Sequence, residues 1–221
     1  MEPTLDDLPR GHARTGRAMF TAGEIDELSR LVGVHRVEAG TPLLRQGDPV
    51  KHIGVIVSGD VELLHRRATR RVVVQVLHPG DLYGDIPLLC GLSMPFSART
   101  LTDAAVIELP HDRFWQLVDH RPYITRRLLF SLASRVERLQ RRLLAVTSGD
   151  LSHQVSSLLL DEVGDAPGEV RLSQATIAEL LGSTRPTVNR VLHQLADAGH
   201  VTLGYRRIEV VDPSGLQRIL G

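Results

Sequence analysis

Residues 181 to 195 read LGSTRPTVNRVLHQL and predict a tight turn between two helices. Gly182 suits the end of the first helix, because glycine readily adopts the left-handed conformation that closes many helices. Ser183 or Thr184 can cap the second helix, and Pro186 fits its first turn, where a missing backbone N–H costs nothing. Two helices joined in this way form either a hairpin inside a core or a DNA-reading helix-turn-helix.

The sequence on both sides extends this motif into a winged helix-turn-helix. Residues 148 to 221 predict a helix, a short strand, two helices joined by the turn, and a final hairpin. The hairpin lies in VTLGYRRIEVV, residues 201 to 211, and turns near Gly204, with apolar residues before and after it. Its tip forms the predicted wing, which carries Tyr205, Arg206 and Arg207.

A long helix is predicted just upstream, over residues 122 to 147. Its apolar residues follow alternating steps of three and four, which is the a/d pattern of a coiled-coil seam. Such a helix lies either on its own barrel or against a second copy of itself, and the regular seam with flanking arginines favours a homodimer. TSGD at 147 to 150 predicts a hinge after the helix. The seam residues are Leu129, Leu132, Val136, Leu139, Leu143 and Val146.

The N-terminal half has the texture of a small β domain. Residues 20 to 121 begin with a short helical pattern and continue as short β-rich runs separated by glycines, which predicts an antiparallel barrel or jelly roll. Residues 1 to 19 contain acidic residues and no apolar stretch, so we expect a flexible tail rather than a signal peptide. The predicted fold class is therefore α+β.

Composition excludes several classes of protein. No apolar run approaches the ~18 residues needed to span a bilayer, so we expect a cytoplasmic protein without membrane partners. Cys90 is the single cysteine of 221 residues, which excludes an internal disulfide framework and an iron–sulfur cluster. We expect no enzyme and no metal site, since the chain contains no nucleophile elbow, Walker loop or spaced metal-ligand set.

The order of β domain, long helix and winged helix-turn-helix resembles the CRP/FNR family of bacterial transcription regulators. The resemblance spans roughly residues 20 to 215. It rests on VSGDVEL at 57–63, GDLYGD at 80–85 and AELLGSTRPTVNRVL at 178–192, besides the seam helix. It implies a homodimer with double-stranded DNA and RNA polymerase as partners. The operator, the target genes and the choice between activation and repression stay open.

In that family the second helix of the motif lies in the major groove. Arg185 and Arg190 match positions where members use arginine, whose fork suits the O6 and N7 acceptors of guanine. Pro186 stands where the best-studied members have glutamate, and proline cannot accept from cytosine N4, so their half-site preference does not transfer. The predicted DNA contacts are Ser183, Thr184, Arg185, Thr187, Asn189, Arg190 and Arg206.

The sensor resembles cyclic-AMP-binding members only in part. Gly84 and Asp85 match the place where an acid accepts from the ribose hydroxyl, but the Arg-Ser pair that holds the cyclic phosphate is replaced by Met94 and Pro95. Burying a phosphate without a charged partner carries an effective desolvation penalty of roughly several kcal/mol. We therefore expect that cyclic AMP recognition is lost. Leu139 and Gln140 replace a Thr-Ser pair of the dimer helix. The predicted effector pocket comprises Gly84, Asp85, Met94, Pro95, Leu139 and Gln140.

Alternatives for the effector remain open at this point. Haem is one, since His65, His78, Cys90 and Met94 offer suitable ligand types, although Cys90 suits a small buried hydrophobe better. An apolar ligand, or no ligand, is another. An architectural DNA-binding protein without an effector is the competing function.

Overall fold

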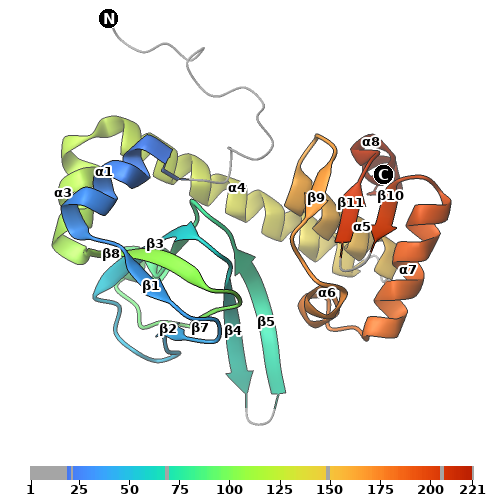
Figure 1. The fold of residues 1–221 in the computed structure, drawn as a ribbon, viewed down its shortest axis with the longest axis horizontal. Helices are drawn as coiled ribbons and strands as arrows, with labels where there is room; N and C mark the ends of the chain where they lie inside the picture. Colours follow the sequence, from blue (N-terminus) through green and yellow to red (C-terminus); the bar gives the residue numbers. More distant parts are fainter. Residues whose placement is uncertain (1–18, 21, 68–69, 148–149, 205–206, 221) are drawn as a thin grey trace, which may run out of the picture. The chain divides into compact units, whose positions relative to one another are not determined.

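The computed structural model describes residues 19–20, 22–67, 70–147, 150–204 and 207–220. The chain divides into two compact units (Figure 1). The N-terminal unit ends at Ser131 and the C-terminal unit begins at Leu132, within the long helix α4. The helices of the chain are α1 Ala22–Val32, α2 Asp85–Cys90, α3 His111–His120, α4 Pro122–Thr147, α5 Leu151–Val163, α6 Gln174–Leu180, α7 Arg185–Asp197 and α8 Pro213–Leu220.

Two antiparallel sheets build the N-terminal unit, with strand orders β1-β8-β3-β6 and β2-β7-β4-β5. In the described strands the two sheets stay separate, so the predicted α+β fold with a jelly roll is confirmed and a closed barrel is not formed. The strands are β1 His35–Val37, β2 Pro42–Leu44, β3 His52–Ser58, β4 Val61–Arg67, β5 Arg70–Leu77, β6 Leu82–Tyr83, β7 Ser97–Thr100 and β8 Ala104–Pro110.

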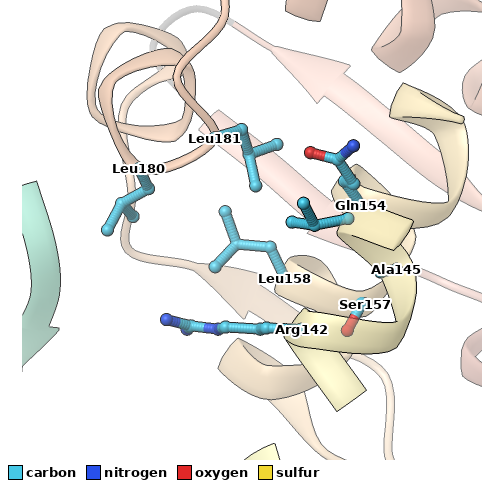
Figure 2. Close-up of a pocket in the computed structure, with 8 residues that line it drawn as sticks. Arg142, Ala145, Gln154, Ser157, Leu158, Leu180 and Leu181 are labelled. Carbon is cyan, nitrogen blue, oxygen red and sulfur yellow. The ribbon is translucent and has the colours of Figure 1, made fainter. Parts of the chain in front are cut away.

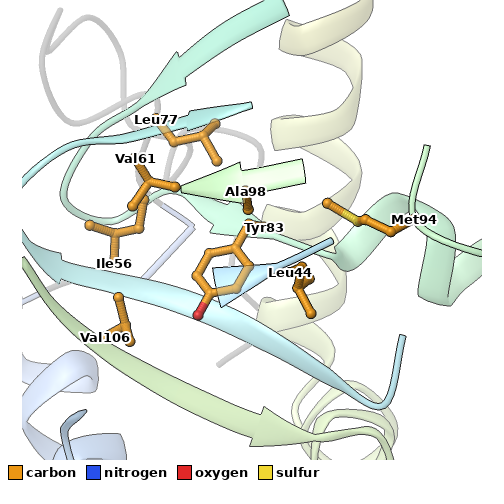
Figure 3. Close-up of a cluster of buried hydrophobic side chains, with 8 residues drawn as sticks. All are labelled: Leu44, Ile56, Val61, Leu77, Tyr83, Met94, Ala98 and Val106. Atoms are coloured by element: carbon orange, nitrogen blue, oxygen red, sulfur yellow. The ribbon is translucent and has the colours of Figure 1, made fainter. Parts of the chain in front are cut away.

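The core of the jelly roll joins side chains from both sheets, and Figure 3 shows them facing one another. Ile56 and Val106 come from the first sheet, and Val61 and Ala98 come from the second. All four are completely buried. Register explains this arrangement, because Ile56 pairs with Val106 across β3 and β8 and both side chains therefore share one face.

The long helix α4 covers the range in which the sequence predicts it. Its first turns belong to the N-terminal unit, where Ile124 and Leu128 are buried. Ion pairs attach the same region to α1: Arg121 binds Glu27 over 3.0 Å, and Arg127 binds Glu24. The predicted hinge includes Ser148 and Gly149, which lie outside the described residues.

The C-terminal unit contains the winged helix-turn-helix. Asp150 caps α5, since its carboxylate accepts from the Ser152 N–H over 2.8 Å. A three-stranded antiparallel sheet of order β10-β11-β9 lies in the same unit, and Figure 1 shows it with α6 and α7 close by. Its strands are β9 Gly168–Val170, β10 Val201–Gly204 and β11 Arg207–Val210.

The N-terminal segment is described only from its last residues onward. Of the predicted tail, only Met19 is described; it is buried, and its N–H donates to the Gly80 carbonyl over 3.1 Å. Among the described residues, no helix has the length and apolar character to cross a bilayer.

Candidate nucleic-acid interface and sensor interior

Hydrogen bonds define the turn between α6 and α7. Gly182 follows α6 with a φ of +61°, the left-handed conformation expected of it. The Ser183 N–H donates to the Ala178 carbonyl over 2.9 Å. Thr184 is the N-cap of α7, and its hydroxyl accepts from the Thr187 N–H over 3.4 Å. These bonds determine where α7 begins and which of its residues face outward.

Helix α7 has one buried and one exposed face. Val188 and Leu192 are completely buried, and Leu195 is nearly so. Arg185 and Arg190 lie on the exposed side. The apolar face attaches α7 to the unit because its residues recur at steps of three and four. The exposed side presents two guanidinium groups, which suit phosphates and guanine edges.

The remaining predicted contacts on this helix already make hydrogen bonds within the protein. The hydroxyls of Thr184 and Thr187 lie 2.8 Å apart and share a hydrogen bond. Asn189 is half-buried, and its Nδ2 donates to Gln174 Oε1 over 3.0 Å. The Asn189 amide thus joins α7 to the first residue of α6, a partner that the sequence reading missed. Its role in DNA contact stays a prediction.

His193 is a further exposed residue of the same helix that the sequence reading missed. It lies three residues after Arg190 and four after Asn189, and its Nδ1 is 2.9 Å from the Asn189 carbonyl oxygen. The helical spacing in the sequence is the signal that could have predicted His193 beside Asn189 and Arg190.

The wing is described only at its base. Strands β10 and β11 pair as predicted, and Gly204 lies opposite Arg207. The guanidinium of Arg207 lies 3.7 Å from Glu169 and 3.4 Å from Glu209, in exposed ion pairs. Arg206, the predicted contact at the tip, and Tyr205 lie outside the described residues.

Met94 is part of the core of the jelly roll (Figure 3). Its side chain is 3% exposed, and its backbone N–H donates to the Asp48 carbonyl over 2.9 Å. Pro95, the next residue, is exposed. Asp85 is buried at the start of α2, directly after Gly84, whose φ is +80°. A thioether therefore occupies the interior at the position where the resemblance expects an arginine.

Tyr83 fills another part of this interior. A side chain on Gly54 would place its Cβ 1.7 Å from the Tyr83 ring, so glycine is required for the ring to lie there. The hydroxyl of Tyr83 is buried and has no hydrogen-bond partner among the described residues. Burial, together with the nearby charge of Glu108, raises the pKa of this hydroxyl. The Tyr83 hydroxyl therefore stays neutral, and the buried side chains of the core cluster around it are apolar.

Arg99 is already paired in the second sheet. Its Nε donates to Glu62 Oε1 over 2.8 Å, and Arg71 binds the other oxygen of the same carboxylate. The Glu62 side chain is 1% exposed. Since an unpaired buried carboxylate is strongly unfavourable, Arg99 and Arg71 stabilise the fold by compensating the charge of Glu62.

The residues considered as haem ligands have other surroundings. Nδ1 of His78 lies 2.8 Å from Asp60, and Nδ1 of His65 lies 3.5 Å from the Pro95 carbonyl oxygen. Cys90 is exposed. Its interpretation as a small buried hydrophobe is wrong, because it ends the short helix α2 just before the left-handed Gly91. The described residues contain no group of three or more metal-binding side chains.

The seam of α4 is exposed. Leu129, Leu139 and Leu143 are each more than 60% exposed, and Val136 and Val146 are more than half exposed. Leu132 is half-buried, and Gln140 is exposed. So long an apolar stripe in contact with water is typical of a surface that another chain covers.

Comparisons with known proteins agree with this architecture. The sequence profile of the cyclic nucleotide-binding domain matches residues 34–121, and that of the Crp-like helix-turn-helix domain matches residues 127–219. The chain is 35% identical over 210 residues to the HTH-type transcriptional regulator Cmr of Mycobacterium tuberculosis, covering 95% of this chain and 85% of that protein.

Two further relatives span the same architecture. Cyclic AMP receptor protein of Thermus thermophilus is 29% identical, with 81% of this chain and 84% of that protein covered. The crystal structure of FixK2 from Bradyrhizobium japonicum superposes with a TM-score of 0.71 at 21% identity, with 84% of this chain and 95% of that chain covered. At this identity the FixK2 likeness concerns the fold alone.

Proposed function

Because the chain belongs to the CRP/FNR family of DNA-binding transcription regulators, we propose that it is a homodimer whose two α7 helices read a near-palindromic operator. The observation that carries this proposal is the exposed pair Arg185 and Arg190 on a helix anchored by a buried apolar face. Two such helices, related by a two-fold axis, enter successive major grooves about 34 Å apart.

Each predicted contact has a distinct task in this complex. Arg185 and Arg190 donate to guanine edges or to phosphates. Thr184 and Thr187 lie at the N-terminus of α7, where N–H groups attract a phosphate. Ser183, Asn189 and Arg206 complete the predicted surface, and His193 extends it. Pro186 gives this chain a half-site preference of its own, since a proline side chain offers no acceptor for cytosine.

The operator can be identified by selecting bound sequences from a random double-stranded DNA library. The affinities of protein variants are then compared on the most enriched sequence. R185A is expected to lose about 5- to 100-fold in specific affinity, the worth of one bidentate base contact. R185K keeps the charge and loses the fork, so it is expected to retain non-specific binding while discriminating less between bases. R218A removes an equal charge from an exposed site on α8 and serves as the control.

A selection without an enriched sequence would contradict the operator proposal. It would favour the competing function, an architectural DNA-binding protein, especially if affinity fell steeply with salt and equally on all sequences.

The homodimer is supported by the exposed seam of α4. Covering a leucine side chain stabilises an assembly by about 1.5–3 kcal/mol. Leu139 and Leu143 alone therefore offer a substantial gain when they meet the same residues of a second chain. The a/d spacing provides the geometry for such a pairing.

The jelly roll is proposed to have lost cyclic AMP recognition. Met94 is packed in the core and carries no charge, Pro95 has no donor, and Arg99 is engaged with Glu62. A cyclic phosphate would therefore enter without a charged partner. Haem is not favoured either, because Met94 belongs to the core and His78 is paired with Asp60.

The proposal also includes RNA polymerase as a partner and the cytoplasm as the location. A dimer on its operator would meet RNA polymerase at a neighbouring promoter, in the cytoplasm where a bacterial chromosome lies.

A further inference from the structure

A side-chain hydrogen bond links the two helices of the helix-turn-helix. Nδ2 of Asn189, on α7, donates to Oε1 of Gln174, the first residue of α6, over 3.0 Å. Both side chains are half-buried, so they lie at the border between the core of the unit and its surface. The Asn189 side chain makes no second hydrogen bond within the part of the chain that the structure describes. Its amide therefore keeps hydrogen-bonding groups for a ligand.

Helix α6 holds Gln174 in place. Ser173, directly before it, is the N-cap whose hydroxyl fixes the start of the helix. In the middle of the helix Ile177 is completely buried. At the other end Leu180 and Leu181 lie beside α5, where they line a small cavity of about 90 Å³ (Figure 2). Gln174 thus belongs to a helix that is capped at its start and anchored by its apolar residues.

The bond to Gln174 leaves a defined set of groups on the Asn189 amide. A primary amide has two N–H donors and one oxygen acceptor. Gln174 takes one N–H, so one N–H and the oxygen remain. Adenine presents the N7 acceptor and the N6 donor in the major groove, which is the complementary pair. Guanine presents two acceptors, N7 and O6, and an amide with one remaining N–H cannot donate to both.

Asn189 lies in line with the exposed residues of α7. It follows Arg185 by four residues and precedes His193 by four, and residues at this spacing share one face of a helix. Arg185, His193 and the neighbouring Arg190 are all exposed. The Asn189 amide therefore adjoins the two guanidinium groups that carry the proposed contact with the operator.

We propose that Asn189 reads an adenine in each half-site of the operator and that Gln174 is the residue that positions its amide. This role rests on the proposed function, because α7 must enter the major groove for Asn189 to meet a base. Gln174 orients the amide before DNA binds, so less rotamer freedom is lost in the complex. By occupying one N–H, it also prevents Asn189 from donating twice to guanine. Gln174 itself touches no base and is a positioning residue.

The test uses the full-length protein and the operator selected for it. Each A·T pair of one half-site is replaced in turn by G·C, and the affinity of the parent and of each variant is measured for every duplex. One replacement is expected to lower the affinity of the parent about 5- to 100-fold, the worth of one bidentate base contact. N189A should lose this adenine preference and keep the base preference that depends on Arg185.

Variants of Gln174 test the positioning role. Q174L removes the acceptor and is expected to lower the ratio of the affinities for the adenine and guanine duplexes about 2- to 10-fold, the worth of one hydrogen bond. Q174E keeps an oxygen that accepts from Asn189, so it should keep this ratio while its negative charge weakens binding to both duplexes alike. Q217L, on α8, removes an exposed glutamine that donates to Asp165 over 2.9 Å. This matched control should bind as the parent does.

A modified base tests whether the contact is direct. 7-Deazaadenine carries a C–H group in place of N7 and accepts no hydrogen bond there. At the identified position it should weaken binding by the parent about 2- to 10-fold and leave binding by N189A unchanged. This result distinguishes a hydrogen bond to the base edge from the reading of DNA shape.

The proposal is overturned if no adenine preference depends on Asn189, if 7-deazaadenine weakens N189A as much as the parent, or if Q174L keeps the ratio of the parent. An equal loss of preference in Q217L would also overturn it. In each of these cases an enriched operator that depends on Arg185 would leave the proposed function standing. If no sequence is enriched, the proposed function and the role of Asn189 fail together. Far-UV circular dichroism checks that each variant is folded.

Discussion

Arg142 donates its Nε to Oδ2 of Asp161 over 2.9 Å and thereby joins the end of α4 to α5. Arg141 adds a second positive group, 3.6 Å from Oδ1 of the same carboxylate. The Asp161 side chain is completely buried, and a buried carboxylate is tolerated only when such partners compensate its desolvation. The attachment of α5 to α4 thus depends on an ion pair that crosses the predicted hinge.

R142A should destabilise the C-terminal unit by about 3 kcal/mol, because it leaves the buried Asp161 with Arg141 alone. Urea unfolding followed by far-UV circular dichroism measures this loss. Trp115, the single tryptophan, lies in the N-terminal unit, so its fluorescence transition is expected to stay near that of the parent. R126A, at an exposed position of α4, is the matched control and should change stability by less than about 0.5 kcal/mol.

L139E should convert the dimer to a monomer. Each of the two chains would bring one glutamate carboxylate into the seam, and both carboxylates would lose their water. The dissociation constant of the dimer is therefore expected to rise on the order of 100-fold or more. Sedimentation equilibrium measures this shift. L144E alters a leucine that is 70% exposed but off the seam, and it should remain dimeric. Monomerisation by L144E and not by L139E would show that another face of α4 mediates assembly.

Cyclic AMP should produce no saturable heat in a calorimetric titration of the dimer, because Met94 and Pro95 offer the phosphate neither charge nor donor. The double substitution M94R/P95S restores both groups and is expected to restore measurable binding. Micromolar affinity in the unchanged protein would contradict the proposed loss. The cyclic AMP receptor protein of Thermus thermophilus is a suitable positive control.

Protonation of Asp212 should lower the stability of the C-terminal unit at acid pH. The Gly215 N–H, which donates to this carboxylate over 2.9 Å, is the main cause that holds its pKa below the ordinary value of 3.8; His200 and Arg218 add to the effect. A lowered pKa in the folded state means that the ionised form stabilises the fold above pH 3.8. This contribution disappears as pH falls through the folded pKa.

The measurement for Asp212 is the urea midpoint of the C-terminal unit between neutral pH and about pH 2. D212N should be less stable at neutral pH and should lose less on acidification than the parent. D197N removes an exposed carboxylate from α7 and is the control. If D212N and the parent have parallel pH profiles, the carboxylate does not stabilise this part of the fold.

Local chemistry accounts for what was predictable in the candidate DNA site. Gly182 adopts the left-handed conformation, Thr184 caps α7 and Pro186 lies in its first turn, because each depends on backbone sterics within a few residues. The buried face of α7 follows from apolar spacing. The bond from Asn189 to Gln174 does not, since it joins residues on two helices whose relative placement depends on packing.

The sequence by itself determined the order of domains, the α+β class, the helix-turn-helix and the apolar seam, because propensity and periodicity act along the chain. Only the tertiary structure decided the surroundings of individual side chains. It exposed Cys90, buried Met94 in the core, paired Arg99 with Glu62 and buried the Ser157 hydroxyl without a hydrogen-bond partner among the described residues. These outcomes depend on which distant segments meet, since burial and charge compensation are properties of the packed fold.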